Sequence, residues 1–265
     1  MTKLWKWSGA GNLFVVIDGR DGGSVSDIQQ LCREHRTDGL MVLRESASGR
    51  DFAMEFYNPD GSSGMMCGNG GRCIAAFGDM LGIKPADGGV FRFDAPDGVH
   101  TAEILQRPAD PATGEWTVRL GMIDVAGITE YPDGLFLNTG TRHFVKFVPD
   151  VEAIVIAAEA LPIRNDARFA PEGTNVNFVQ PGPIVKIRTF EKGVEGETAA
   201  CGTGITAAAI ACCYKGVAPA SESADGRIAY RLQAREATLS VDFIQNKKDA
   251  FSDVFLTGPA RILAE

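Results

Sequence analysis

The chain has 265 residues, of which 45% are apolar, and it carries a formal net charge of −8 with an isoelectric point near 5.0. A chain of this length can bury one large core or two modest ones. The acidic balance argues against a nucleic-acid partner or an anionic membrane surface. Apolar runs fall short of the ~20 residues of a membrane span, and the first residues lack the apolar stretch of a signal peptide, so we expect a cytoplasmic protein without a membrane partner.

The first half is predicted to be a sheet of short strands with one buried helix. Ser26 begins a capping-box pattern, so a helix carrying His35 in a structural role is expected after it. The turn signal Asn-Pro-Asp-Gly at residues 58–61 leads toward a second helix after Cys67. Strands are expected, from alternating or apolar runs, at residues 13–18, 40–43, 51–57, 90–93, 101–105 and 116–120.

The second half repeats this plan. A helix is expected from Asp150 to Glu159, ended by Pro162, and residues 138–143 are predicted to form a polar bend that ends at His143. The run 205–213 is apolar on all sides, which predicts a helix encased in sheet. Strands are expected at residues 135–137, 144–148, 175–179, 185–190, 228–232, 238–243 and 254–257.

Two cysteines each precede a glycine-rich turn that leads into an apolar run. The turns are Cys-Gly-Asn-Gly at residues 67–70 and Cys-Gly-Thr-Gly at residues 201–204, about half the chain length apart. A helix start offers unpaired N–H groups and partial positive charge, which favour a thiolate and a bound carboxylate. We therefore expect a duplicated unit: residues 1–125 with 254–265 form the half that carries Cys67, and residues 126–253 form the half that carries Cys201.

The other cysteines are given a structural interpretation. Cys32, Cys212 and Cys213 lie in helical apolar patterns, where cysteine behaves as a small buried hydrophobe. The chain is expected to keep its thiols reduced. Cys67 and Cys73 are spaced too widely for a common zinc motif, so neither a metal nor a cofactor is expected.

Two activated thiols suit one difficult reaction. Removing the α-proton of an amino acid needs an electron-sink cofactor, or a base on each face of the carbon with positive field on the carboxylate. With one thiolate and one thiol, either enantiomer can lose its proton to one sulfur and receive a proton from the other. The ordinary cysteine pKa of ~8.5 must fall for this chemistry, which calls for the helix-start field and a neighbouring base such as His143.

Five motifs resemble the diaminopimelate epimerase family, and the resemblance covers most of the chain. They are Gly-Ala-Gly-Asn at 9–12, the turn at 57–62, the two cysteine motifs at 66–73 and 191–204, and the strand at 174–179. The two cysteine motifs in this order are a specific signal. The resemblance implies an α/β (α+β) fold of two pseudo-symmetric halves, each a mixed, curled β-sheet around a central helix. It further implies a cofactor-independent isomerase that interconverts LL- and meso-diaminopimelate for lysine and cell-wall precursors, and a homodimer.

The resemblance also assigns roles to single residues. Cys67 and Cys201 would be the paired acid and base, assisted by His143 and Glu191. Backbone N–H groups at the two glycine turns would hold the reacting carboxylate, and polar side chains would hold the distal group of the amino-acid substrate. The implied substrate-binding residues are Asn12, Asn58, Gly68, Asn69, Thr141, Asn175, Glu191, Lys192, Gly202 and Thr203.

The sequence departs from the family at several positions. Ser8 and Leu13 stand where the opening motif usually has His and Asp, and Thr141-Arg142 replaces Asn-Pro before the histidine. Lys192 replaces an Arg and offers a point charge in place of a bidentate fork, for which Arg142 is a candidate to compensate. These departures fall on the distal side of the substrate. A racemase of another polar or basic amino acid therefore stays open.

Other interpretations also stay open. A cysteine hydrolase or transferase could use Cys201 with His143 but leaves Cys67 unexplained, and a non-enzymatic anion-binding protein would not need thiols. His143 could instead be a strand-end histidine bonded to backbone. Glu197 is interpreted as an ordinary loop acid, and Arg72 is expected to pair with a carboxylate of its own helix.

Overall fold

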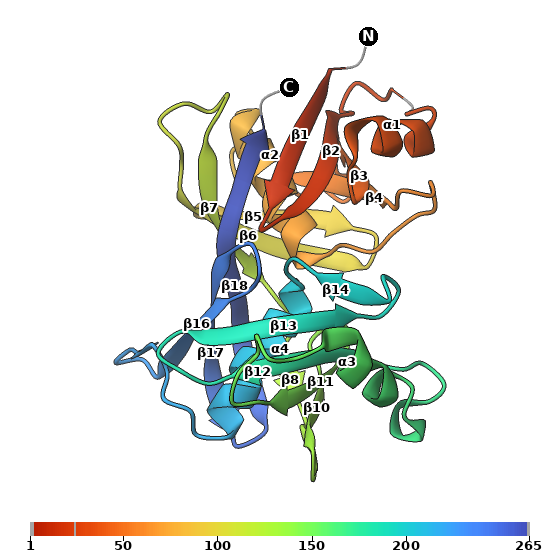
Figure 1. Ribbon diagram of the computed structural model, residues 1–265. Coiled ribbons are helices and arrows are strands. Elements are labelled where there is room, and N and C mark those ends of the chain that lie inside the picture. Colours follow the sequence, from red (N-terminus) through yellow and green to blue (C-terminus); the bar gives the residue numbers. More distant parts are fainter. Residues whose placement is uncertain (1–2, 24, 264–265) are drawn as a thin grey trace. The chain divides into compact units, whose positions relative to one another are not determined.

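The computed structural model describes residues 3–23 and 25–263, and the chain divides into two compact units (Figure 1). The first unit comprises residues 1–121 and 257–265, and the second comprises residues 122–256. Each unit contains one of the two helices that follow a cysteine. Over the described ranges, the helices are too short or too polar to span a membrane.

The first unit is a closed ring of strands around helix α2 (Gly68–Met80), with α1 (Ile28–His35) outside against β2 and β3 (Figure 1). Its strands are β1 (Leu4–Gly9), β2 (Asn12–Asp18), β3 (Gly39–Arg44), β4 (Phe52–Tyr57), β5 (Val90–Ala95), β6 (Gly98–Gln106), β7 (Glu115–Gly121) and the end of β18 (Ala250–Leu263). Each strand pairs with the next, and β18 pairs with both β7 and β1, which closes the ring. Residues 68–78 of α2 are all buried, because the ring encloses them.

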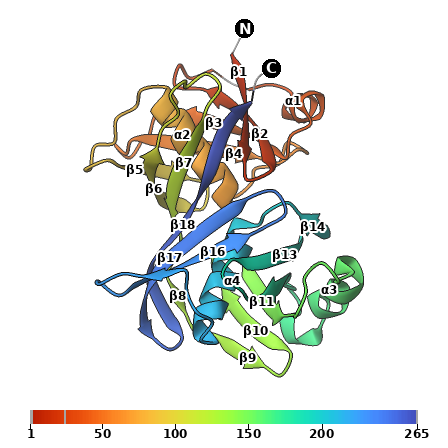
Figure 2. The same ribbon diagram turned by 60° about the vertical axis from the view of Figure 1, so that its left-hand side comes forward.

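The second unit surrounds helix α4 (Gly202–Tyr214) in the same way, and α3 (Ile156–Arg164) packs against β12, β13 and β14 (Figure 2). Its remaining elements are β8 (Val125–Ala126), β9 (Thr129–Tyr131), β10 (Gly134–Asn138), β11 (Arg142–Phe147), the 3-10 turn Ala167–Phe169, β12 (Asn175–Gln180), β13 (Val185–Glu191), β14 (Gly196–Thr198), β15 (Ser221–Glu222), β16 (Arg227–Gln233), β17 (Thr238–Lys247) and the start of β18. Helix α4 contacts β10, β11, β12, β13, β16 and β17.

The two units follow one topology. Strands β1 to β6 pair in order as antiparallel, parallel, antiparallel, parallel and antiparallel. The same sequence of pairings joins β10, β11, β12, β13, β16 and β17. In each unit a helix crosses between the parallel strands and the cysteine-capped helix follows the fourth strand. The predicted architecture of two similar halves, each a mixed sheet around a central helix, is confirmed.

Most of the predicted elements are confirmed, but two helix boundaries differ. Helix α1 begins after Asp27, whose carboxylate accepts the N–H of Gln30, and not after Ser26. The prediction of a helix from residue 150 to 159 is wrong, because α3 spans Ile156–Arg164 with Pro162 inside it. Ala160 and Ile163 are buried in the apolar cluster beside the sheet. Their packing outweighs the one backbone hydrogen bond that proline removes near the end of a short helix.

Candidate active site

The start of α2 is built around Cys67 and a glycine on the neighbouring strand. Cys67 has extended backbone angles and caps the helix, and its Sγ accepts the N–H of Gly70 at 3.2 Å. Gly9 on β1 allows close approach, because a Cβ there would lie 2.6 Å from the carbonyl oxygen of Asn69. The turn between β1 and β2 can therefore lie directly against the helix start. That turn leads into Asn12.

A chain of polar side chains runs along this contact. The Asn69 amide nitrogen donates to Asn12 Oδ1 at 2.6 Å, and the Asn12 amide nitrogen donates to Asp38 Oδ2 at 3.1 Å. The same carboxylate oxygen accepts the backbone N–H of Leu13 at 2.9 Å. Leu13 is the position where the family motif usually carries Asp. In this chain a carboxylate reaches that turn from the residue before β3.

Arg72 completes the chain from inside the helix. Its guanidinium donates to the Gly68 carbonyl oxygen at 3.1 Å, to Asn69 Oδ1 at 2.7 Å and to the Pro259 carbonyl oxygen at 3.3 Å. The prediction that Arg72 pairs with a carboxylate of its helix is wrong. The acid of that helix, Asp79, instead accepts hydrogen bonds from residues 107 and 116. Arg72 is fully buried, so a cation lies beneath the helix start.

The start of α4 is also reached through a glycine. Cys201 is 8% exposed and caps the helix. Gly204 permits close packing onto β11 and β12, because a Cβ there would lie 2.5 Å from Asn177 Oδ1 and 3.3 Å from His143 Cε1. The helix start is therefore held directly against the histidine.

His143 is a neutral hydrogen-bond donor in this arrangement. It lies in β11, not at the end of a bend as predicted, and it is fully buried. Burial lowers its pKa to about 3, because the imidazolium is poorly solvated there. The Asn177 amide nitrogen donates to the Phe144 carbonyl at 3.2 Å and faces His143 Nδ1 at 3.0 Å. A carbonyl only accepts, so the amide nitrogen faces both groups, Nδ1 accepts, and the proton sits on Nε2.

The hydroxyls of Thr141 and Thr203 link this donor to the cysteine. His143 Nε2 lies 2.9 Å from each hydroxyl oxygen, and the two oxygens lie 3.0 Å apart. The Thr203 hydroxyl lies 3.4 Å from Cys201 Sγ. The Asn175 amide nitrogen contacts the Thr141 hydroxyl at 3.3 Å, and Asn175 Oδ1 accepts the backbone N–H of residue 192 at 2.8 Å.

These contacts have a consistent direction. Asn175 must present its nitrogen to Thr141, because its oxygen is used by a backbone donor. The Nε2–H and the amide therefore both donate into the hydroxyl pair, and when Thr141 donates to Thr203 the Thr203 proton is free to point at Cys201 Sγ. Such an arrangement favours an acceptor at that sulfur. A thiolate fits this role better than a thiol.

The predicted distal-side residues lie at the end of β13 and on the neighbouring strand. Glu191 ends β13, and Lys192 follows it with an exposed side chain. Arg142, the candidate to compensate for Lys192, donates to Glu172 at 2.5 Å. In the first unit, Asn58 lies in the turn after β4, where its amide donates to the Ser62 hydroxyl at 3.0 Å. The guanidinium of Arg142 is thus engaged by a carboxylate of the protein itself.

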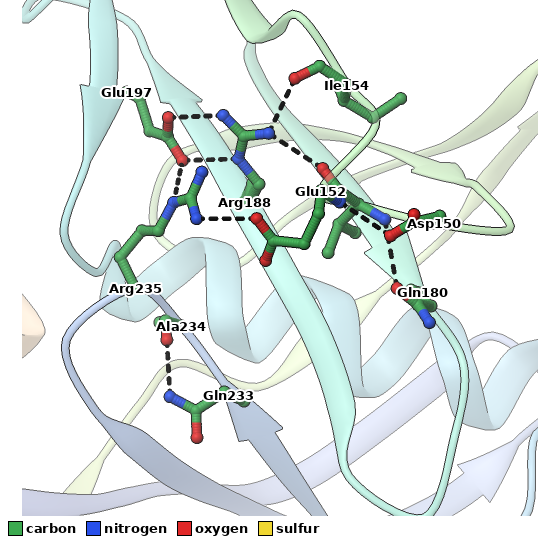
Figure 3. Close-up of polar contacts among 10 residues, drawn as sticks. Asp150, Glu152, Ile154, Gln180, Arg188, Glu197, Gln233, Ala234 and Arg235 are labelled. Atoms are coloured by element: carbon green, nitrogen blue, oxygen red, sulfur yellow. Dashed lines mark hydrogen bonds and ion pairs between the residues drawn. The ribbon is translucent and has the colours of Figure 1, made fainter.

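Glu197 is part of a charged network and is not an ordinary loop acid. It lies on β14 and accepts two hydrogen bonds from Arg188, each at 2.7 Å, and one from Arg235 at 2.8 Å (Figure 3). Arg188 also donates to the carbonyl oxygens of Val151 and Ile154 at 2.9 and 2.8 Å. The pKa of Glu197 is lowered, chiefly by its hydrogen bonds to Arg188. The network fixes the strand that leads to Cys201.

The remaining cysteines are poor candidates for chemistry. Burial raises the pKa of Cys73 and of Cys212 to about 12, and it also raises the pKa of Cys32 and Cys213. These thiols keep their protons at neutral pH. Across the described part of the chain, His, Cys, Asp and Glu side chains do not gather in groups of three that could hold a metal ion.

The structure brings the predicted residues together in two groups. The first unit groups Cys67, Gly68, Asn69 and Asn12 at one helix start. The second groups Cys201, Thr203, His143, Thr141 and Asn175, with the backbone of Lys192. The sequence interpretation missed Asp38, Asn177 and Arg188, and it assigned Arg72 a carboxylate partner in place of the oxygens of Gly68, Asn69 and Pro259. Their sequence signals were weak. Asp38 is a polar residue before a predicted strand, Arg72 is a cation within the helix expected after Cys67, and Asn175 and Asn177 alternate in one strand.

The comparisons with known proteins agree with one another. The family model "Diaminopimelate epimerase" matches residues 4–109 and 135–260. The diaminopimelate epimerase of Chlorobaculum tepidum is 36% identical, with 96% of both chains covered. That of Aquifex aeolicus is 37% identical, with 97% of this chain and 94% of the other covered.

Solved structures with far lower identity share the fold. A Bacillus anthracis phenazine biosynthesis protein of the PhzF family superimposes with a TM-score of 0.73 at 10% identity, covering 99% of this chain and 97% of that one. A hydroxyproline epimerase from Agrobacterium vitis gives a TM-score of 0.61 at 14% identity, covering 99% and 92%. The sequence matches go beyond the fold, since they span both units and both cysteine motifs. The chain belongs to the diaminopimelate epimerase family.

Proposed function

We propose that this protein interconverts LL- and meso-diaminopimelate by proton transfer between two cysteines, without a cofactor. The observation that carries the proposal is the pair of equivalent helix starts. Cys67 and Cys201 each cap the central helix of their unit, and each sulfur faces a hydrogen-bond donor, Gly70 N–H in one unit and the Thr203 hydroxyl in the other. The family relationship supplies the substrate.

In the proposed reaction one sulfur starts as a thiolate and the other as a thiol. The thiolate takes the α-proton, charge moves onto the substrate carboxylate, and the thiol delivers its proton to the opposite face. The protein ends with the protonation states exchanged, ready for the reverse reaction. His143 supports this cycle as a neutral donor through Thr203, and Glu191 is proposed as the assisting acid of the second motif.

The carboxylate that takes up charge is proposed to bind at the helix starts. The N–H groups of Gly68 and Asn69 in one unit, and of Gly202 and Thr203 in the other, lie in first turns where the helix dipole favours negative charge. The distal amino-acid group is proposed to bind at polar side chains beyond these turns. They are Asn12, Asn58, Thr141, Asn175, Glu191 and Lys192.

Deuterium exchange tests the two-thiol mechanism. In D₂O the enzyme should incorporate deuterium at the α-position of the product from either isomer. Cys67→Ala and Cys201→Ala should each lower turnover by roughly 10³-fold or more, since each removes a group that transfers the proton. Cys213→Ala is the matched control, because this cysteine lies at the far end of α4 and should leave turnover near wild type.

Two outcomes would contradict the proposal. Turnover that survives Cys67→Ala would favour a hydrolase or transferase that uses Cys201 alone. Isomerisation without solvent deuterium in the product would exclude proton exchange with the protein sulfurs.

A racemase of another polar or basic amino acid is a second candidate, favoured by the distal contacts. Arg142 is paired with Glu172, which leaves Lys192 as the nearby cation for a distal carboxylate. A substrate with a neutral or basic side chain has no distal carboxylate and would not need a cation at that site. Assays of LL-diaminopimelate beside single amino acids decide between them: a higher kcat/KM for a monocarboxylic amino acid would replace diaminopimelate as the substrate.

We also propose a cytoplasmic location and a homodimer. Two thiols that must stay reduced suit a reducing compartment, and the homodimer follows from the family resemblance. Sedimentation of the purified chain and loss of activity after oxidation would support these proposals. A fully active chain that sediments as a monomer would contradict the proposed homodimer.

A further inference from the structure

The hydrogen-bonded series of side chains Arg72, Asn69, Asn12 and Asp38 has a charged group at each end. We propose that Arg72 and Asp38 are positioning residues that hold the amides of Asn69 and Asn12 in one orientation, and so fix the groups that Asn12 offers to a substrate. The role of Asn12 toward substrate rests on the proposed function. The orientation of the two amides does not.

The orientation is fixed because each end group has a single hydrogen-bonding role. A guanidinium only donates, so Asn69 must turn its oxygen toward Arg72, at 2.7 Å. Its amide nitrogen then faces Asn12 Oδ1, at 2.6 Å. An ionised carboxylate only accepts, so Asn12 must turn its nitrogen toward Asp38, at 3.1 Å. Rotating either amide by half a turn would oppose two donors or two acceptors.

Burial makes this arrangement strong. Arg72 is fully buried and Asn69 is 2% exposed. Burial lowers the pKa of Arg72 to about 10, so the guanidinium still carries its charge at neutral pH. Among its hydrogen-bond acceptors in residues 3–23 and 25–263 there are two carbonyls and one amide, and no carboxylate. The two amide dipoles therefore align between a buried cation and an exposed anion, and aligned hydrogen bonds strengthen one another in a medium of low dielectric.

The consequence lies at Asn12. A side-chain amide has two N–H donors and two oxygen lone pairs. Within the described residues, one donor is used by Asp38 and one lone pair by Asn69. One N–H and one lone pair are left, at fixed positions. Such a pair matches an amino-acid terminus, which presents both an ammonium donor and a carboxylate acceptor.

Asp38→Asn tests the exposed end of the chain without disturbing the core. The Leu13 N–H keeps an acceptor oxygen at residue 38, but an amide there carries no negative charge, so its hydrogen bond to Asn12 is weaker and holds the Asn12 amide less firmly. We expect KM for the amino-acid substrate to rise about tenfold with kcat changed less than about twofold, as for loss of one oriented hydrogen bond. Asp110→Asn is the matched control, because Asp110 is also exposed and accepts one backbone N–H and one hydroxyl. The control should keep the wild-type KM, and an unchanged KM in Asp38→Asn would overturn the proposal.

Arg72→Lys tests the buried end. Lysine keeps the charge but loses the planar fork, so it should weaken the hold on Asn69 and raise KM by about threefold to tenfold. The double variant Asp38→Asn, Arg72→Lys should raise KM by clearly less than the product of the single effects, because both changes release the same two amides. Strictly multiplicative effects on KM would show that Arg72 and Asp38 act independently, and would contradict the proposed coupling through the two amides.

A structural measurement separates this inference from the proposed function. The side-chain NH₂ resonances of Asn12 and Asn69 can be assigned by NMR through Asn12→Asp and Asn69→Asp. In the ligand-free wild type each should give one pair of signals with slow hydrogen exchange, and in Asp38→Asn the Asn12 pair should broaden or exchange faster. If wild type fails to epimerise diaminopimelate but shows these signals, only the function is lost. Fast hydrogen exchange of the Asn12 side-chain NH₂ group in wild type would contradict the fixed orientation of this amide, even if the enzyme is fully active.

Discussion

The start of α2 and the start of α4 share a backbone plan but differ in the hydrogen-bond donor that faces the sulfur. Cys67 is exposed and its sulfur accepts a backbone N–H of its own helix. Cys201 is buried and its sulfur faces the Thr203 hydroxyl. The same local geometry therefore supports two sulfurs by two different kinds of donor.

The difference continues one turn into each helix. Five residues after the cysteine stands Arg72 in one unit and Thr206 in the other, and each bonds the carbonyl oxygen of the first helical residue, at 3.1 and 3.0 Å. A buried charge in one unit thus takes the place of a hydroxyl in the other. The buried guanidinium of Arg72 is held in one place and gives the helix start a rigid support, whereas the Thr206 hydroxyl can rotate.

The neighbouring strands repeat this contrast. In the first unit Asn69 contacts Asn12, and in the second Thr203 contacts Thr141 and a neutral histidine. The amides have one allowed orientation, while the hydroxyls can reverse theirs when the charge on the nearby sulfur changes. The duplicated topology therefore provides one fixed support and one adjustable support. If this contrast holds, the second unit depends on its uncharged, buried network.

The largest expected effect is on stability at acid pH. The folded pKa of His143, about 3, lies below the ordinary value of ~6.5 expected when unfolded. Between these values the unfolded chain binds the extra proton, so unfolding free energy should fall as pH drops, by up to about 1.4 kcal/mol per pH unit. Urea unfolding from pH 7 to 4 should show a steeper loss in wild type than in His143→Gln.

This measurement addresses His143 through the difference between two proteins, because other acid groups titrate equally in both. Parallel stability curves for wild type and His143→Gln would mean that the histidine is protonated within the folded unit. The buried, uncharged network of the second unit would then be incorrect, and with it the contrast to the charged first unit.

The next largest effect concerns the hydroxyl that reaches Cys201. Thr203→Val keeps the shape of the side chain but removes the donor, which should lower kcat/KM by roughly 10- to 100-fold, the value of a hydrogen bond to a charged group. Alkylation of Cys201 by iodoacetamide should also require a higher pH, because the thiolate loses a donor. Peptide mapping can follow Cys201 and Cys67 separately.

Thr206→Val is the matched control for this change. Its hydroxyl bonds the Gly202 carbonyl in the same helix and does not contact the sulfur, so the variant should stay within about threefold of wild type. Equal losses in Thr203→Val and Thr206→Val would indicate a general effect on the helix start and not a specific donor to Cys201.

The sequence predicted the frame of both helix starts but not their support. The glycine turns and the apolar runs that follow are local signals, so the capped helices after Cys67 and Cys201 could be predicted from residue pattern alone. The role of Asp38 could not, because its contact joins residues far apart in the chain, Asn12 and Asp38. Arg72 bonds Gly68 and Asn69 within its own helix, but its third acceptor, the Pro259 carbonyl oxygen, lies far along the chain. A pattern of single residues does not reveal which buried donor meets which acceptor.

The misplacement of α3 has the same origin. The apolar run from residue 153 suggested an early helix and Pro162 an end, but burial of Ala160 and Ile163 against the sheet selected a later segment. Tertiary packing overrode local propensity. His143 was expected at a bend for a similar reason, since the pairing of β11 with β12 extends the strand over it.

The smallest expected effect on turnover concerns the charges that hold the segment before Cys201. Glu197 pairs in the sheet with Phe190. Ser63, which also lies four residues before its cysteine, forms a single bridge to Tyr57. The second unit therefore carries its charges before the cysteine, where Arg188 and Glu197 meet (Figure 3). The first carries them beneath the helix.

Glu197→Gln should destabilise the second unit by about 1–3 kcal/mol, because it leaves the Arg188 guanidinium, 8% exposed, without its carboxylate. Turnover should fall only about threefold, since the thiol and its donors are untouched while the strand before them loosens. Glu152→Gln removes the outer carboxylate of the same network, which is 56% exposed, and should change stability by less than about 0.5 kcal/mol. If Glu152→Gln cost as much as Glu197→Gln, the network would act as a surface feature, and the fixed entry to Cys201 would have to come from backbone pairing alone.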